Sequence, residues 1–236
     1  MIRLLCLVVG YFFGAFQTAY FYGKMHGIDI RTMGSGNAGT TNTLRVLGTK
    51  AGLIVLAGDV VKTILAIMVA RLLIIPRTAD PNMEYLLVLY TAAGAILGHN
   101  FPFYMQFKGG KGIASTFGLI LSFHPWFIPM GFIVFLGIFI TTHYVSLGSL
   151  LIYAGFVIQL FIMGQAGYLG DMTQGMLNEM YIIAFLLMAM AYWKHRENIK
   201  RLLTGTERKT YLFKKNKVEA GNVKEETSQT ENTDVE

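Results

Sequence analysis

The stretch AGLIVLAGDVVKTILAIMVARLLII (residues 51–75) decides the class of fold. It is longer than the roughly 20 apolar residues that a helix needs to cross a bilayer. Asp59 and Lys62 interrupt it, and charges inside a membrane are costly and are usually paired. The stretch is typical of a membrane-spanning helix, and the sequence therefore predicts an all-α, polytopic integral membrane protein.

The composition of the whole chain agrees with this prediction. Of its 236 residues 53% are hydrophobic and 14% are charged, and the mean hydropathy is +0.48. A soluble domain carries about 25% charged residues. Cys6 is the single cysteine, which excludes an internal disulfide and a cysteine metal cluster.

Further apolar runs predict the other spans. Residues 4–23 contain Gly10 and Gly14 at a spacing that suits close helix packing. The run 113–142 is long for one helix, and its prolines predict a bend near His124 and Pro125. The predicted spans are 4–23, 51–75, 85–98, the two halves of 113–142, 145–163 and 180–193. They make seven spans, or five if the two weakest segments are re-entrant.

The end of the chain has a different composition. Residues 214–236 are rich in Glu, Thr and Asn and contain almost no large apolar side chains. Such a segment buries too little apolar surface to order itself. We expect an integral membrane domain over residues 1–213 and a disordered polar cytoplasmic tail over 214–236.

Basic residues set the orientation, because cytoplasmic loops of membrane proteins carry an excess of Lys and Arg. The loop 164–179 has neither. Arg71 and Arg77 argue mildly against the pattern, but acidic residues lie beside them. The basic groups gather in three polar segments: Lys24, Arg31, Arg45, Lys50; Lys108, Lys111; Lys194, Arg196, Lys200, Arg201. We therefore expect an outside N-terminus, a cytoplasmic C-terminus, and all three segments at the cytoplasmic face.

The net charge of +6 bears on the partners of the chain. Because the basic groups lie between apolar spans, they favour anionic lipid and phosphate over nucleic acid. No nucleic-acid partner is expected.

The first polar segment contains GSGNAGTTN (residues 34–42). Its glycines permit positive φ angles, and concave runs of backbone N–H groups bind anionic oxygens. Ser35, Thr41 and Asn42 add neutral donors, and Arg45 adds a planar fork that suits phosphate. The alternative is a flexible turn before an interfacial helix. Arg45 at the membrane face favours anion binding.

The second polar segment contains GHNFPF (98–103) and FKGGKG (107–112). Lys108 and Lys111 flank two glycines, so ammonium groups and backbone amides can converge on one phosphate. A helix beginning near Gly112 would favour the same anion. Gly112 stands where a Walker A loop needs Ser or Thr, so nucleotide hydrolysis is not expected. The alternative is a basic turn that only sets topology.

The third polar segment reads YWKHRENIKRLL (192–203) and continues to Gly205 and Glu207. His195 and Asn198 would share one face of a helix. A snorkelling basic helix end explains Lys and Arg but explains His and Asn less well.

Together these motifs resemble the bacterial acyl-phosphate-dependent glycerol-3-phosphate acyltransferase family, PlsY. The resemblance covers residues 1–207 and rests on the order and spacing of three motifs: Gly34 to Asn37 with Thr41 and Asn42; Gly98 and His99 with 107–112; His195, Asn198, Gly205 and Glu207. Ala38 stands where the family usually carries proline.

The resemblance implies a seven-helix enzyme of the bacterial cell membrane with its active site on the cytoplasmic side. It would move a fatty acyl group from acyl phosphate to the 1-hydroxyl of glycerol 3-phosphate, giving lysophosphatidic acid and phosphate. This is the first acylation step of phospholipid synthesis and needs no metal or nucleotide cofactor. The implied partners are glycerol 3-phosphate, acyl phosphate and membrane lipid.

The resemblance also implies site residues. The catalytic set would be His195, Asn198, Lys111 and Ser35, which with Arg45 would hold the glycerol phosphate. Further substrate-binding residues would be Gly36, Asn37, Thr41, Asn42, Lys108, Gly109, Gly110, Gly112, Ser146, Ser149 and Glu207. Helix-packing serines are the alternative for Ser146 and Ser149.

The base for the glycerol hydroxyl stays open between His195 and His99. No histidine is followed at the fifth position by Asp, so the signature of acyl-CoA-using acyltransferases is absent. We hypothesise proton transfer through the phosphate of glycerol phosphate, with His195 mainly positioning. Asp59 and Lys62 stay outside the catalytic set, because a structural ion pair explains them as well as a function does.

Two other classes of function compete. A transporter for an organic anion would predict a repeated half-domain, and residues 1–112 show no correspondence to 113–213. A non-catalytic membrane scaffold would leave three glycine and basic motifs on one face unexplained.

Overall fold

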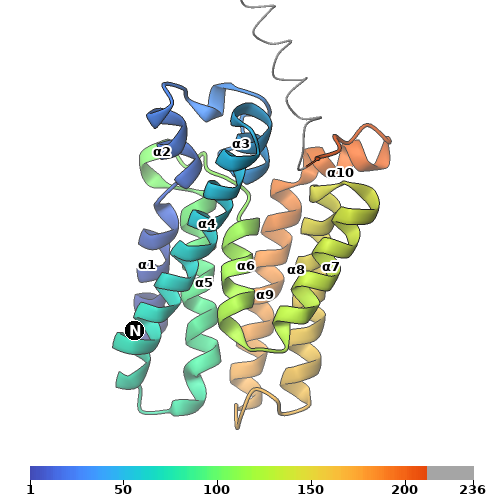
Figure 1. Cartoon of the computed structure of the whole chain (residues 1–236). Coiled ribbons are helices and arrows are strands. Elements are labelled where there is room, and N and C mark those ends of the chain that lie inside the picture. The colour runs from blue at the N-terminus through green and yellow to red at the C-terminus, as the bar shows by residue number, and fades with distance from the viewer. Residues whose placement is uncertain (212–236) are drawn as a thin grey trace, which may run out of the picture.

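The computed structural model describes residues 1–211, in which every regular element is helical (Figure 1). The predicted tail, 214–236, lies outside these residues. The helices are α1 (Ile2–Ala15), α2 (Thr18–Met25), α3 (Thr40–Leu47), α4 (Thr49–Val69), α5 (Glu84–Asn100), α6 (Ile113–Phe123), α7 (Phe127–Thr142), α8 (Val145–Gln165), α9 (Gln174–Lys194) and α10 (Arg196–Leu203). Short helical turns are η1 (Ile30–Thr32), η2 (Ala70–Ile74, a π-helix), η3 (Ile75–Arg77), η4 (Pro81–Met83) and η5 (Phe103–Met105).

Five segments of the described chain are long and apolar enough to cross a membrane: Ile2–Met25, Thr49–Arg77, Pro81–Met105, Val145–Gln165 and Gln174–Lys194. The helices α6 and α7 are apolar but shorter. They form an antiparallel pair in which α6 packs on α4 and α7 packs on α8. The predicted helical membrane bundle is confirmed as a class.

The close pairing of α1 with α5 depends on glycines. A Cβ on Gly10 or Gly14 would collide with the backbone of α5, and one on Gly94 or Gly98 would collide with the backbone of α1. Small residues four apart on both helices let the backbones approach. The packing role predicted for Gly10 and Gly14 is confirmed, and it makes α5 the central helix of the bundle.

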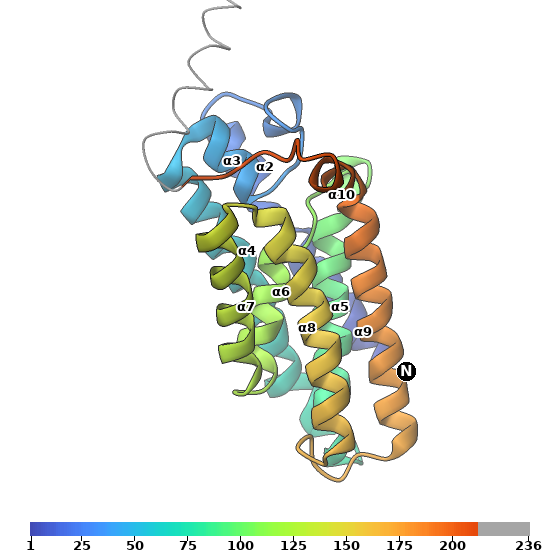
Figure 2. The same ribbon diagram turned by 90° about the vertical axis from the view of Figure 1, so that its right-hand side faces the viewer.

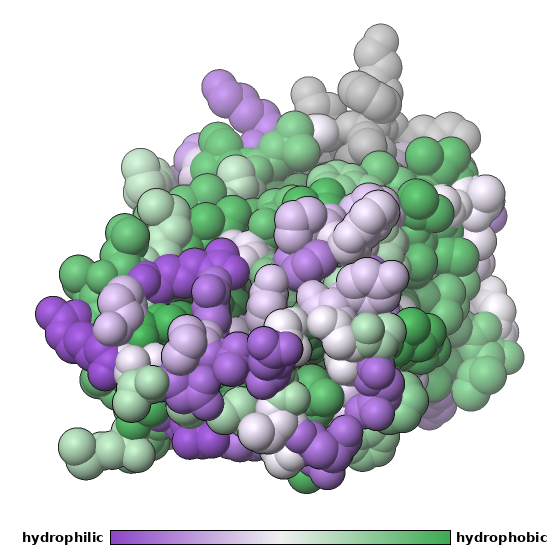
Figure 3. Space-filling model, turned by 90° about the horizontal axis from the view of Figure 1, so that it is seen from below, coloured by the Kyte–Doolittle hydropathy of each residue, from purple (hydrophilic) through white to green (hydrophobic). Residues whose placement is uncertain are grey.

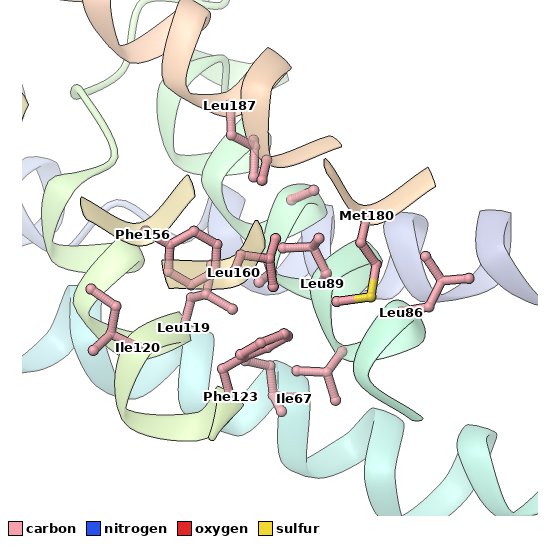
Figure 4. Close-up of a cluster of buried hydrophobic side chains, with 14 of the residues drawn as sticks. Ile67, Leu86, Leu89, Leu119, Ile120, Phe123, Phe156, Leu160, Met180 and Leu187 are labelled. Carbon is pink, nitrogen blue, oxygen red and sulfur yellow. The ribbon is translucent and has the colours of Figure 1, made fainter. Parts of the chain in front are cut away.

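A buried apolar cluster joins α5 to its neighbours (Figure 4). Phe123 of α6 packs edge-on against Phe156 of α8, with ring centroids 5.7 Å apart. Other members include Ile67, Leu86, Leu89, Leu119, Ile120, Leu160, Met180 and Leu187.

The first predicted span is broken rather than continuous. The α-helix ends at Ala15 and resumes at Thr18, because Phe16 and Gln17 take extended conformations. The carbonyls released by the break find polar partners: Tyr104 donates to Ala15 O at 2.8 Å, and Lys62 donates to Phe16 O at 2.7 Å. A break at membrane depth is tolerated where such groups satisfy the backbone.

The other boundaries lie close to the prediction. The split near His124 and Pro125 is confirmed, since α6 ends at Phe123 and α7 begins at Phe127. Pro129 falls in the first turn of α7, where a missing N–H breaks no helical hydrogen bond. The last predicted span corresponds to α9, which starts at Gln174 rather than 180, because the Thr173 side chain caps it by accepting from Met176 N at 3.3 Å.

The three polar segments meet at one end of the bundle, near α2, α3 and α10. In Figure 2 the chain after α10 crosses this end toward α3. Thr210 N donates to His143 O at 2.9 Å on the way, and Arg45 donates to the Thr210 hydroxyl at 3.0 Å. Figure 3 shows the opposite end, where hydrophilic residues gather among hydrophobic ones.

Candidate active site

A cavity of about 1050 Å³ opens at the end where the three polar segments meet. Every site residue expected from the sequence lines it except Gly110, which is buried beneath the loop surface. The lining residues from that set are Ser35, Gly36, Asn37, Thr41, Asn42, Arg45, Lys108, Gly109, Lys111, Gly112, Ser146, Ser149, His195, Asn198 and Glu207. The structure thus brings together residues that are far apart in the chain.

The first polar segment presents Ser35 to the cavity. Gly34 and Gly36 have φ angles of 62° and 70°, which glycine adopts without steric cost. Asn42 Oδ1 accepts from Ser35 N at 2.7 Å and from Ser35 Oγ at 3.1 Å. The Asn42 amide also donates to Ile30 O and Met33 O, each at 3.0 Å.

Asn42 therefore differs from the expectation for it. Both of its N–H groups are already engaged, so its side chain holds the loop and orients Ser35 instead of offering a donor to a substrate. The first turn of α3 supplies donors nearby, because the first N–H groups of a helix have no intrahelical acceptor. Thr40 and Thr41 place that turn at the cavity wall.

The second polar segment uses its glycine amides internally. Gly109 N donates to Asn100 O at 3.2 Å, and Gly110 N donates to His99 O at 3.1 Å. The expected convergence of these two amides on a phosphate is therefore not what the structure shows. The available donors are the Lys111 side chain and the first turn of α6, which begins after Gly112 at φ 82°.

The third polar segment bends at His195. His195 lies between α9 and α10 with φ −99° and ψ 8°, so His195 and Asn198 do not share one uninterrupted helix. His195 is 2% exposed, and its Nδ1 lies 2.8 Å from Ala191 O. Because a carbonyl only accepts, Nδ1 carries the proton, and Nε2 of the neutral ring is an acceptor.

A chain of hydrogen bonds connects the second and third segments. Lys111 Nζ donates to Asn198 Oδ1. Asn198 Nδ2 donates to Glu207 Oε1 at 2.7 Å, and that oxygen also accepts from Ser146 Oγ at 2.8 Å. Arg201 Nε donates to Glu207 Oε2 at 2.7 Å. Both carboxylate oxygens of Glu207 thus accept hydrogen bonds from the protein, and the side chain orients the groups around it.

The two serines of α8 have different surroundings. Ser146 belongs to the Glu207 network, whereas Ser149 Oγ donates to Val145 O within its own helix at 2.7 Å. Ser149 lines the cavity, but its hydroxyl hydrogen is engaged within α8.

Burial changes the proton affinity of the two central basic groups. It lowers the pKa of Lys111 to about 8, with nearby arginines and Lys194 adding to the effect. It lowers the pKa of His195 to about 4, with the Lys111 charge as the second cause. Burial alone would raise the pKa of Glu207, but hydrogen bonds from Asn198, Arg201 and Ser146 outweigh it and hold that pKa below its usual value. Near neutral pH the site therefore holds a charged Lys111, a neutral His195 and a charged Glu207.

The cavity continues into an apolar arm between α4, α6 and α7. Its walls are Leu53, Leu56 and Val60; Phe117 and Leu121; Phe132, Phe135, Leu136 and Phe139. Three of these side chains, Leu53, Phe132 and Leu136, are more than 40% exposed, on the outer surface that apolar helices present to lipid. The site thus joins a cationic head to a hydrophobic groove.

Asp59 and His99 also line the cavity, although the sequence left Asp59 outside the site. Asp59 pairs with Lys62 at 2.8 Å, and both side chains are at most 6% exposed. The sequence did indicate these residues, as two charges one helical turn apart inside a predicted span, but it could not show that Asp59 faces the cavity. Among residues 1–211 no group of three or more His, Cys, Asp or Glu side chains is arranged to hold a metal ion.

Comparisons with known proteins agree with this geometry. The family model described as glycerol-3-phosphate acyltransferase matches residues 4–205. The glycerol-3-phosphate acyltransferase of Clostridioides difficile (strain 630) is 38% identical over 213 residues, covering 87% of this chain and 94% of the relative. That of Thermotoga petrophila is 40% identical over 212 residues, covering 88% and 96%.

Two crystal structures of PlsY (YgiH), an integral membrane glycerol 3-phosphate acyltransferase, share the fold at 30% sequence identity. The glycerol 3-phosphate form gives a TM-score of 0.74 and the lysophosphatidic acid form 0.72. Each match covers 89% of this chain and 96% of the other. With a family match over most of its length and relatives near 40% identity, this chain belongs to the glycerol-3-phosphate acyltransferase family of integral membrane enzymes of phospholipid synthesis.

Proposed function

We propose that this enzyme transfers a fatty acyl group from acyl phosphate to the 1-hydroxyl of glycerol 3-phosphate. The observation that carries the proposal is the single cavity in which a cationic head, with Arg45 and Lys111, opens into an apolar arm. Acyl phosphate has the same two parts, a phosphate and a hydrocarbon chain. Glycerol 3-phosphate needs a second anion-binding contact for its phosphate but no apolar surface.

In the proposed complex the glycerol phosphate lies among Ser35, Arg45, Lys111, His195 and Asn198. Lys111 and Arg45 supply charge, and Asn198 and Ser35 supply oriented polar groups that line the same cavity. The phosphate of the donor lies toward the loop that carries Gly36, Asn37 and Thr41, with Lys108 at the rim. Its acyl chain follows Leu56, Phe117 and Leu136 toward the lipid.

The reaction needs little covalent help from the protein, because the acyl group is already activated. The glycerol 1-hydroxyl oxygen attacks the acyl carbon, the bond from that carbon to the phosphate oxygen breaks, and phosphate leaves with the bonding pair. Cations and amides stabilise the oxyanion and the leaving phosphate, and positioning lowers the barrier further.

The hydroxyl proton passes to a phosphate oxygen of glycerol 3-phosphate in this mechanism. A pKa of about 4 makes His195 a weak base at neutral pH. Its unprotonated Nε2 can still accept a hydrogen bond from the hydroxyl and so direct the attack. Lys111 supplies the positive charge, Asn198 has a second side-chain N–H to donate, and the Ser35 hydroxyl turns from Asn42 to the substrate when it binds.

The proposed topology has seven spans with the N-terminus outside and the site facing the cytoplasm. Support comes from basic residues at the end with the cavity: Arg31 and Lys108 line the cavity, and Lys24 and Lys200 lie in α2 and α10, which Figure 1 shows at that end. At the other end Arg71 is paired with Glu84 at 3.0 Å. Labelling of single cysteines at Ser35 and Gly170 in intact bacterial cells tests it, in a Cys6→Ser background.

The activity is tested with purified protein in lipid vesicles, supplied with glycerol 3-phosphate and either acyl phosphate or acyl-CoA. We expect phosphate release and lysophosphatidic acid with the first donor and no thiol release with the second. Glycerol in place of glycerol 3-phosphate serves as the control and should give no product. Thiol release from acyl-CoA at a rate similar to phosphate release from acyl phosphate would contradict acyl phosphate as the donor. Absence of product with both donors would contradict the proposed acyltransferase activity.

A further inference from the structure

Three buried polar side chains outside the expected catalytic set form a cluster at the cavity, which two of them line. Asp59 and Lys62 lie one turn apart on α4, and His99 lies in the last turn of α5. They are 1%, 5% and 3% exposed. Charges so deeply buried are kept in a membrane protein only when they are paired, and they usually serve a function.

Lys62 is the centre of this cluster. Its Nζ lies 2.8 Å from Asp59 Oδ1, 2.7 Å from Phe16 O and 2.9 Å from His99 Nδ1. An ammonium group has three donors and no acceptor, so all three donors are used. His99 Nδ1 must then be the acceptor, which leaves the ring proton of the neutral imidazole on Nε2.

The same cluster holds the break between α1 and α2. Lys62 bonds to the carbonyl of Phe16 at the break, and Thr18 Oγ1 donates to Asp59 Oδ1 at 3.0 Å. Gln17 Nε2 donates to His99 O at 2.9 Å. The start of α2, which leads into the first polar segment, is therefore attached to α4 and α5 through these groups.

His99 supports the second polar segment from below. Its carbonyl accepts from Gly110 N at 3.1 Å, and its ring packs against the Gly110 backbone. A Cβ on Gly110 would collide with His99 Nε2 and would lie 2.8 Å from Ala38 O. The imidazole therefore stands where the loop carrying Ala38 meets the loop carrying Lys111.

We propose that Asp59, Lys62 and His99 are positioning residues. They hold the first and second polar segments in fixed relative positions, so that Lys111 meets the phosphate of glycerol 3-phosphate. The proposal rests on the function proposed above. Because His99 Nδ1 accepts from Lys62 and Nε2 lies against Gly110, the imidazole acts through the loop and does not take the hydroxyl proton.

The test removes both charges together with the donor to His99. The double variant Asp59→Leu, Lys62→Met replaces a buried pair by apolar residues of similar size, a change that is often neutral for stability. A matched control is Arg3→Met with Glu179→Leu, which removes the pair at 2.7 Å between α1 and α9, away from the cavity. The thermal midpoint is measured beside kcat and the KM for glycerol 3-phosphate, in vesicles supplied with acyl phosphate.

A positioning role predicts that the α4 double variant raises this KM about ten-fold, the loss of roughly one oriented charge-assisted hydrogen bond, and changes kcat less. The control pair should leave KM unchanged whatever its thermal midpoint. A merely structural role predicts a lowered midpoint with an unaltered KM, and that result overturns the proposal. Wild-type protein without turnover would instead overturn the proposed function.

His99→Asn provides a second variant should the double variant fail to fold. Asn keeps an acceptor near the Nδ1 position for Lys62 but removes the ring edge that supports Gly110. We expect the same rise in KM with a nearly unchanged kcat. A fall in kcat with loss of a near-neutral limb in the pH profile would instead show that His99 is a base and would overturn the positioning role.

Discussion

The ammonium group of Lys111 donates a hydrogen bond to the side-chain oxygen of Asn198, 87 residues further along the chain. Lys111 precedes α6 and Asn198 lies in α10, so the bond ties the second and third polar segments into one wall of the cavity. Glu207 extends the wall by accepting from Asn198 and Ser146. The position of the Lys111 ammonium group therefore depends on three parts of the chain.

The pH dependence should report Lys111. Burial lowers its pKa to about 8, so the charged form that attracts phosphate is present below that pH and is lost above it. We expect kcat/KM for glycerol 3-phosphate to be level near neutral pH and to fall about ten-fold per pH unit above roughly pH 8. Lys111→Arg should lower the level but remove this fall, because arginine stays charged. An identical limb in that variant would contradict the assignment.

His195 should act without titrating near neutrality. Burial lowers its pKa to about 4, so the ring is neutral from about pH 5 upward. His195→Gln, which keeps a polar group near Nε2, should lower kcat by about ten-fold or less, below the 10²–10⁴ that a general base contributes. The shape of the pH profile between 6 and 8 should not change. Loss of a near-neutral limb in this variant would identify His195 as the base.

Glu207→Gln should destabilise the end of the bundle that holds the cavity. The carboxylate accepts three hydrogen bonds, from Ser146, Asn198 and Arg201. An amide leaves at least one of these donors without an acceptor, which costs about 1–3 kcal/mol of stability. Thermal unfolding in detergent measures the loss. Glu197→Gln is the control, because Glu197 is exposed and lies 3.9 Å from Arg196, and it should unfold like the wild type.

The close packing of α1 against α5 gives a prediction about stability alone. Gly94→Ala should lower the thermal midpoint, because its Cβ would collide with Leu7 O in α1 and overpacking costs about 1–3 kcal/mol. Gly137→Ala on α7 meets no atom within 4 Å and should be neutral or stabilising by up to about 1 kcal/mol. Equal midpoints for the two variants would show that α1 and α5 are free to separate.

Much of the architecture was predictable because it depends on local composition. The apolar runs and Pro125 predicted a helical membrane bundle and the turn between α6 and α7, and the glycines of α1 predicted close helix packing without indicating α5 as the partner. The break at Phe16 was not predictable, since Lys62 and Tyr104 from other helices satisfy the carbonyls that it releases. Nothing in residues 4–23 alone favours that break.

The sequence by itself determined a membrane-embedded helical bundle and the three segments whose chemistry suits phosphate, because the transfer free energy of each segment depends on its own residues. Only the tertiary structure decided which polar groups remain free for a substrate. It turned Asn42 and the amides of Gly109 and Gly110 inward and set His195 between two helices. A hydrogen bond depends on where both partners lie, and partners such as Lys111 and Asn198 meet only when the helices pack.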